Sequence, residues 1–182
     1  MKALLLPAVL SILLVTGTIE DRPDLPWSEG MTSPRLEQLK KQIKSGAPGA
    51  VEDFWKEMQA RHTPLVETPP GDKSHALVTF LYRAEGTVKS VVLISQLTSS
   101  RDPGAVVLTQ LPATDVWYRT YLLRNDMRLS YSFVPNPTAE SLAYHSELQL
   151  KDPLNPLYVP GVANVGNSVL QLPAAPGQPW IV

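Results

Sequence analysis

The sequence of 182 residues contains no cysteine. Disulfide bonds, thiol catalysis, thiolate metal sites and a lipid-modified N-terminal cysteine are therefore excluded. Histidine is scarce as well, at three residues, namely His62, His75 and His145. Their spacing fits neither H-x-x-x-H nor H-x-x-E-H, so we expect no metal site. The glycines form neither a G-x-x-x-x-G-K nor a G-x-G-x-x-G phosphate-binding loop.

Neither positive nor negative charge is in large excess, since the formal net charge is -1. A basic field that would attract nucleic acid is lacking, so we expect no nucleic-acid partner. Proline is abundant instead, at 18 residues, which favours many turns and strand edges over a helical bundle. The length suits one domain of ordinary size with additional terminal segments.

The N-terminus resembles a secretory signal. Lys2 precedes an apolar run, Ala3 to Val15, and small residues follow at positions 16–18. The run is shorter than the about 20 apolar residues that span a bilayer, so we expect no stable membrane span. We predict a signal peptide over residues 1–18 and a periplasmic or secreted protein; an uncleaved anchor, or a cytoplasmic protein with a misassigned start, is the alternative. The polar, proline-rich residues 19–32 are predicted to be a linker.

Residues 33–61 carry the signals of two short helices that lead into the main domain. Ser33 is a predicted N-cap, Pro34 stands at the first helical position and Gly46 is a stop signal. The apolar residues of the first helix recur at helical spacing, and those of the second share one face. The residues on these two faces are Leu36, Leu39, Ile43, Val51, Phe54, Trp55 and Met58.

From residue 75 onward the pattern changes to strands, which we expect at residues 75–84, 88–95, 105–111 and 168–172 and in a hairpin near residue 125. The segment "DPLNP", Asp152 to Pro156, predicts consecutive turns in a rigid loop. Several strands at short intervals without strand–helix alternation indicate a mainly β protein. We expect an antiparallel β-sandwich over residues 62–182.

The hairpin "TDVWYRTYLLRNDMRLSYSF" spans residues 114–133. A two-residue turn at Asn125-Asp126 would set Leu122 opposite Leu129 and alternate the side chains between two faces. The predicted core face holds Val116, Tyr118, Leu122, Leu129, Tyr131 and Phe133. The opposite face holds Asp115, Trp117, Arg119, Tyr121, Arg128, Ser130 and Ser132. Two large aromatics with two arginines are unusual on a face that meets only water, so we expect this face to contact another surface.

Six strings occur in an order that resembles the N-terminal domain of bacterial enterochelin (enterobactin) esterases: "HTPLVE" from His62, "VTFLYR" from Val78, "TDVWYRTYLL" from Thr114, "SYSF" from Ser130, "DPLNP" from Asp152 and "LQLPAAPGQPW" from Leu170. The resemblance implies an immunoglobulin-like (early-set) sandwich that precedes an α/β-hydrolase domain. In that family the hydrolase cleaves ferric enterobactin and related catecholate siderophores. Iron would then enter only as part of the substrate, and no cofactor is expected in this chain.

The sequence departs from the family pattern in its catalytic half. A hydrolase of this kind needs a serine on a G-x-S-x-G elbow, followed by an acid and a histidine. The nearest string is "GNSVL", Gly166 to Leu170, which lacks the second glycine. We therefore expect no catalytic residue and an absent hydrolase domain, with such a domain as partner in cis or in trans. A carbohydrate-binding module, like the sandwiches of glycogen-branching enzymes, and a stand-alone interaction domain are alternatives.

Four residues are candidates for a ligand or partner contact: Trp117, Arg119, Tyr121 and Arg128. Three interpretations remain open for the first three of them. They pack against the N-terminal helices, they dock the hydrolase domain, or they bind an anionic, aromatic ferric catecholate through guanidinium and ring faces. Helix packing is favoured for Trp117 and a partner contact for Arg119, because a guanidinium seldom stays buried and unpaired.

Overall fold

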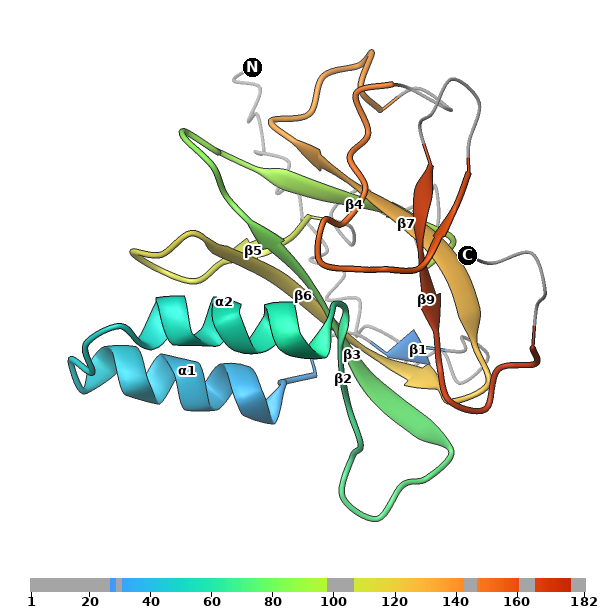
Figure 1. The fold of residues 1–182 in the computed structure, drawn as a ribbon, viewed down its shortest axis with the longest axis horizontal. Helices are drawn as coiled ribbons and strands as arrows, with labels where there is room; N and C mark the ends of the chain where they lie inside the picture. The colour runs from blue at the N-terminus through green and yellow to red at the C-terminus, as the bar shows by residue number, and fades with distance from the viewer. Residues whose placement is uncertain (1–26, 29–30, 98–106, 143–146, 161–165, 178–182) are drawn as a thin grey trace, which may run out of the picture.

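The described part of the protein is mainly β, with two antiparallel sheets and two short helices (Figure 1). The computed structural model describes residues 27–28, 31–97, 107–142, 147–160 and 166–177. The predicted signal peptide and His145 lie outside this part of the chain. The elements in chain order are β1 (Trp27–Ser28), α1 (Pro34–Lys44), α2 (Ala50–Arg61), β2 (Leu65–Glu67), β3 (His75–Arg83), β4 (Val91–Ser95), β5 (Thr109–Gln110), β6 (Val116–Arg124), β7 (Arg128–Pro135), β8 (Tyr158–Val159) and β9 (Asn167–Gln171).

Sheet A is built around the long pair β3 and β6, which match from His75 opposite Arg124 to Arg83 opposite Val116. Its strand order is β1-β6-β3-β2, and β5 also pairs with β6. β1 lies within the segment predicted to be a linker, and its Trp27 pairs with Leu123. Thus residues 27–28 belong to the sheet.

Sheet B has the order β4-β7-β9-β8. β7 pairs with β4 on one edge, where Leu93 lies opposite Phe133, and with β9 on the other, where Tyr131 lies opposite Ser168. The strands predicted from residues 75, 88 and 168 are confirmed as β3, β4 and β9, while β5 covers only a small part of the predicted strand 105–111. The short edge strands β2 and β8 carry too few residues for a period-2 pattern, and the sequence did not predict them.

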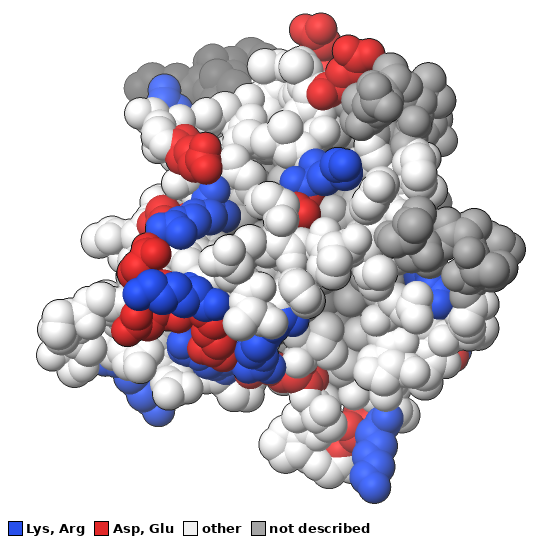
Figure 2. Space-filling view, viewed as in Figure 1, with Lys and Arg blue, Asp and Glu red and all other residues white. Residues whose placement is uncertain are grey.

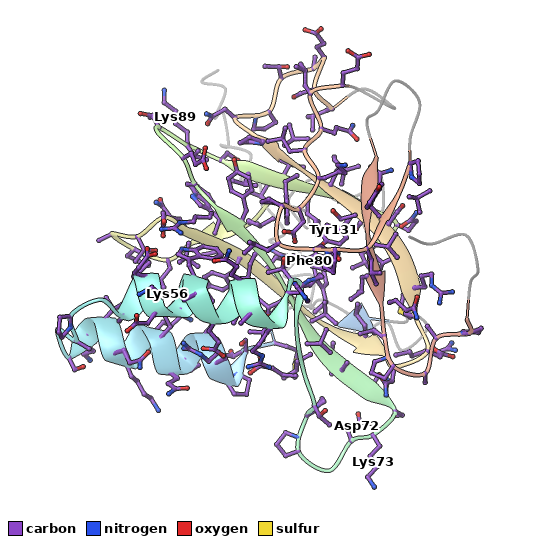
Figure 3. The ribbon with its side chains drawn as sticks, in the orientation of Figure 1. Lys56, Asp72, Lys73, Phe80, Lys89 and Tyr131 are labelled. Carbon is purple, nitrogen blue, oxygen red and sulfur yellow. The ribbon has the colours of Figure 1, made fainter. Side chains whose placement is uncertain are left out.

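The main core lies between the two sheets. Phe80 of β3 contacts Tyr131 of β7 edge to face, with ring centroids 4.9 Å apart, and both rings are labelled at the centre of Figure 3. Tyr131 also contacts Phe133, and Tyr82 of β3 contacts Phe133 at 5.5 Å. Such edge-to-face pairs contribute about 0.5–1.5 kcal/mol each beyond the burial of their area.

The helices α1 and α2 lie side by side on the outer face of sheet A (Figure 1). The predicted cap is confirmed, because the Ser33 hydroxyl accepts a hydrogen bond of 3.1 Å from the backbone N–H of Leu36. The buried side chains of this second core are Leu36, Leu39, Ala50, Phe54, Trp55, Met58, Leu65, Leu81, Leu111 and Val116. The predicted helix faces are thus the ones that pack on the sheet.

Trp55 and Arg83 attach α2 to the sheet through one carboxylate. The indole N–H of Trp55 donates to Asp115 over 2.9 Å, and Arg83 Nε donates to the other oxygen of that carboxylate over 2.8 Å. Arg83 also pairs with Glu52 and lies over the Trp55 ring. A buried indole needs such an acceptor, which explains a carboxylate at the start of β6.

The predicted hairpin is wrong, because β6 and β7 lie in different sheets. The residues between them form a corner: Asn125 N–H donates to Ser74 O beside sheet A, and Leu172 N–H donates to Met127 O beside sheet B. Leu122 therefore does not face Leu129. Two consecutive strands joined by a short turn show the same alternation whether they pair as a hairpin or lie in different sheets. Alternation alone does not identify the partner strand.

Candidate functional site

The four residues predicted to contact a ligand or partner do not form one surface. Trp117 and Tyr121 are 5% and 1% exposed and belong to the core between the sheets. The prediction that they lie on the face away from the core is wrong, and so is the packing of Trp117 against the helices. The helices meet the other face of β6, which carries Val116 and Tyr118. The inversion follows from the missing hairpin, since the interior face of β6 was assigned from its supposed pairing with β7.

Arg119 points to the same side of β6 as Trp117 and Tyr121, but it is half-buried. Its guanidinium lies 5.9 Å from the centroid of the Tyr121 ring, and Nη1 donates to Val107 O over 3.4 Å. Arg128 belongs to β7 in the other sheet, where Nε donates to Gln171 Oε1 over 3.3 Å. The two arginines are therefore held by different sheets, and their role in a contact stays a prediction.

A buried polar cluster lies instead beneath the segment 147–160, at the predicted "DPLNP" turn. Asp152 is 3% exposed, and its carboxylate accepts hydrogen bonds from Tyr131 Oη at 2.7 Å and Thr63 Oγ1 at 2.8 Å. Asn155 Nδ2 donates to Tyr131 Oη over 2.9 Å. The backbone N–H of Asp152 donates to Ser168 Oγ over 2.8 Å. This cluster joins the end of α2 to β7 and β9. The predicted consecutive turns are confirmed, because Leu154 N–H donates to Asp152 Oδ1 and Leu157 N–H donates to Asn155 Oδ1.

Burial governs the ionisation of this cluster. Burial raises the pKa of Asp152 above its usual value, although the hydrogen bonds from Tyr131, Thr63 and the backbone of Leu154 oppose the rise. Burial, followed by the nearby Asp152 carboxylate, holds the pKa of Tyr131 well above its usual value. Tyr131 is therefore a hydrogen-bond donor at all ordinary pH values. A neutral phenol that donates to a buried carboxylate serves here as a structural support.

The segment 147–160 carries exposed apolar side chains above this cluster. Leu148 is 50% exposed, Leu150 43%, Tyr158 37% and Val159 38%. Figure 2 shows charged side chains gathered over α1 and α2, and separate charged groups near the centre and at the top of the view. Leu148 and Leu150 are two residues apart, whereas Tyr158 and Val159 are neighbours in β8 and point to opposite faces of sheet B.

Ser168 of the near-elbow string "GNSVL" lies within β9 and is 1% exposed. Its Oγ accepts the backbone N–H of Asp152 and lies in the buried cluster. A nucleophilic serine has to project from a sharp strand-to-helix turn toward its substrate. Ser168 is therefore a structural residue.

The chain matches the family model for the N-terminal part of enterochelin esterase over residues 77–181. The chain belongs to this family. It is 31% identical over 151 residues to the Iron(III) salmochelin esterase of Escherichia coli, covering 78% of this chain and 37% of that protein. It is 31% identical over 115 residues to the Iron(III) enterobactin esterase of Dickeya dadantii, covering 58% of this chain and 26% of that protein.

A crystal structure of the enterobactin esterase of Shigella flexneri, in the presence of 2,3-dihydroxy-N-benzoyl-serine, has a similar fold. The TM-score is 0.51 at 25% identity, over 70% of this chain and 36% of that one. This chain thus spans between about a quarter and little more than a third of these esterases. The match to the family includes Tyr131, Asp152, Asn155 and Ser168 of the buried cluster, but not its Thr63 and not α1 and α2, which precede residue 77.

The exposure of Leu148 and Leu150 in this enterochelin esterase N-terminal domain was not found by sequence reasoning. Leucines at positions 148 and 150 alternate with polar residues as they would in a strand with a buried face, so exposure could not be read from them. The sequence also left open a sugar-binding module with a planar row of aromatics. Among the phenylalanine, tryptophan and tyrosine side chains whose exposure is described, Tyr158 alone is exposed. No described surface therefore presents such a row.

No described helix is both long and apolar enough to cross a bilayer. The described residues likewise contain no cluster of acidic and histidine side chains with the geometry to hold a metal ion. His75 bonds to Asp72 in an exposed turn, with Nδ1 2.7 Å from Oδ2. This pair is a local turn contact.

Proposed function

We propose that this chain is a non-catalytic accessory domain of an enterobactin-esterase-like protein. It binds an α/β-hydrolase domain, in cis or on another chain, and shapes the access of a ferric catecholate siderophore to that domain. Iron belongs to the substrate in this proposal, and the domain itself carries no cofactor. The two sheets would form an immunoglobulin-like sandwich of the early-set class, exported by the signal peptide.

The observation that carries the proposal is the family match combined with its extent. Residues 77–181 match the N-terminal part of the family, and the chain spans 37% of the related salmochelin esterase. The related salmochelin esterase therefore contains a further part that this chain does not cover. Ser168, the serine of the string "GNSVL", is buried and cannot reach a substrate. Its burial supports a non-catalytic, accessory role.

Direct contact between the siderophore and this chain would fall to Arg119 and Arg128, which are half-buried, rather than to Trp117 and Tyr121, which are buried. A guanidinium suits an anionic catecholate. Neither arginine is needed for the accessory role itself, so this contact is an addition to the proposal.

The test uses a fusion in which this chain replaces the matching part of the Escherichia coli salmochelin esterase. We expect the purified chain alone to give no turnover of enterobactin or simple esters, with or without Ser168→Ala. We expect the fusion to fold as a soluble protein and to hydrolyse ferric catecholate. Turnover by the chain alone that Ser168→Ala abolishes would contradict the non-catalytic role. A fusion that is insoluble or inactive would contradict the accessory role.

A further inference from the structure

We infer that the junction between α2 and β2 is strained at His62 and is held in place by a latch of three buried side chains. The latch consists of Thr63, Asp152 and Tyr131. In this conformational device, release of the latch frees the junction while the two sheets remain paired. The inference does not depend on the proposed function, because it concerns the described domain alone.

The backbone of His62 has a conformation that normally requires glycine. Its φ is 66° and its ψ is 166°. Residues other than glycine are strained in this region and remain there only when the surrounding structure imposes it. The imidazole is exposed, so burial of this side chain does not fix the conformation. The residues on either side of His62 impose it.

Both sides of the junction are anchored in the core between the helices and sheet A. On one side α2 ends at Arg61 and buries the side chain of Met58 in this core. On the other side β2 begins at Leu65, whose side chain is buried in the same core. A short connection between a buried helix and a buried strand has little freedom to relax, which is the condition for retaining strain.

The latch binds this connection from the side of sheet B. Thr63 is buried; its Oγ1 donates to Asp152 Oδ1 over 2.8 Å, and its N–H donates to Leu154 O over 3.3 Å. Asp152 is itself held by Tyr131 of β7, whose Oη donates to Oδ2 over 2.7 Å. The residue that follows His62 is thus bonded through one carboxylate to the other sheet.

Opening the latch is unfavourable because it leaves buried groups without partners. The carboxylate of Asp152 accepts hydrogen bonds from Thr63, from Tyr131 and from the backbone N–H of Leu154. A buried acceptor that loses its donor is destabilising, because its desolvation is no longer compensated. This penalty is comparable to the strain of one residue, so the latch can hold the junction.

The first test compares glycine and alanine at position 62. His62→Gly removes the Cβ atom and with it the strain, whereas His62→Ala removes the imidazole and keeps the Cβ atom. At an unstrained position glycine is less stable than alanine, because it gives the unfolded chain more freedom. We expect the reverse here, with a melting temperature of His62→Gly about 2 °C or more above that of His62→Ala. A glycine variant that melts at or below the alanine variant would overturn the inference.

The second test asks whether the latch holds the strain. Thr63→Val removes the hydroxyl donor to Asp152, and the junction can then relax, so His62→Gly should add no stability in this background. Thr120→Val is the matched control, because Thr120 is also buried and its hydroxyl shares a hydrogen bond of 2.9 Å with that of Thr79 within sheet A. In Thr120→Val the glycine variant should keep its full gain. An equal gain in both backgrounds would show that the latch does not hold the strain.

Amide hydrogen exchange shows whether the latch opens without the sheets. In Thr63→Val we expect the N–H of Leu154 to exchange about tenfold or more faster than in wild type, and the N–H groups between β3 and β6 to change less. Equal acceleration at both places would mean that the whole domain is loosened, against the inference. The same comparisons can be made with Tyr131→Phe, which removes the other hydroxyl donor to Asp152, if Thr63→Val does not fold. None of these measurements involves hydrolysis, so a failure of the proposed function is distinguished from a failure of the latch.

Discussion

The hydroxyl of Tyr131 donates a hydrogen bond of 2.7 Å to the carboxylate of Asp152, and both side chains are buried. Tyr131 belongs to β7, whereas Asp152 comes from the segment 147–160. The ring of Tyr131 also contacts Phe80 in the other sheet, at 4.9 Å between centroids. One side chain therefore connects the core between the sheets with the buried polar cluster.

Tyr131→Phe removes this hydroxyl and keeps the ring. We expect a loss of about 1–3 kcal/mol in the free energy of unfolding, because the buried Asp152 carboxylate and Asn155 amide each lose a partner. Tyr158→Phe is the control: it removes the hydroxyl of an exposed ring and should change stability by less than about 0.5 kcal/mol. Urea unfolding followed by tryptophan fluorescence gives both values. Equal effects of the two variants would show that the cluster does not support the fold.

The ionisation of Asp152 predicts a pH dependence with a definite sign. Because burial raises its pKa in the folded state, its stabilising contribution is complete below the unfolded value of about 3.9. That contribution is lost as the pH rises through the higher folded pKa. The unfolding free energy of the wild type minus that of Asp152→Asn should therefore decrease as the pH rises through this window. A difference that is constant with pH would contradict the raised pKa.

Asp72 predicts the opposite sign and serves as the comparison. Hydrogen bonds from Ser74 and then His75 lower the pKa of Asp72 to about 2. Its stabilising contribution is present above the unfolded value of about 3.9 and is lost as the pH falls toward the folded value. The advantage of wild type over Asp72→Asn should therefore shrink on acidification. This carboxylate is exposed, so the change should be small, and high salt should reduce it.

Trp117→Ala should cost about 3–5 kcal/mol, because it leaves a large cavity between the sheets. The assignment of Trp117 to an outer, dispensable face predicts almost no change, so a single thermal melt separates the two positions of this side chain. Thr109→Ala on the exposed strand β5 is the control and should stay within about 0.5 kcal/mol of wild type. A melting temperature of Trp117→Ala equal to that of the control would mean that β6 presents its other face to the core.

Asp115→Ala should separate α2 from sheet A. It removes the acceptor of the buried Trp55 indole N–H and of Arg83, so we expect a loss of about 1–3 kcal/mol. Glu52→Ala breaks only the exposed pair with Arg83 and should cost less than about 1 kcal/mol. Thermal melting compares the two variants, and a larger effect of Glu52→Ala would contradict the role given to Asp115.

The local elements were determined by the sequence. The caps and apolar spacing of residues 33–61 predicted two helices with the correct buried faces, because these signals act within a few residues. The strands at residues 75, 88 and 168 followed from β-branched and aromatic runs. The six ordered strings identified the family, which the match over residues 77–181 confirms.

Only the tertiary structure decided which strands pair and which side chains are covered. The same alternation in residues 114–133 suits a hairpin and a crossing between sheets, and the choice depends on β3, β4 and β9, which are distant in sequence. That choice placed Trp117 and Tyr121 in the core. It also left Leu148 and Leu150 exposed and Asp152 buried. Burial depends on how the two sheets pack. The sequence of a strand therefore predicts that its side chains alternate between two faces, but it does not predict which strand pairs with it.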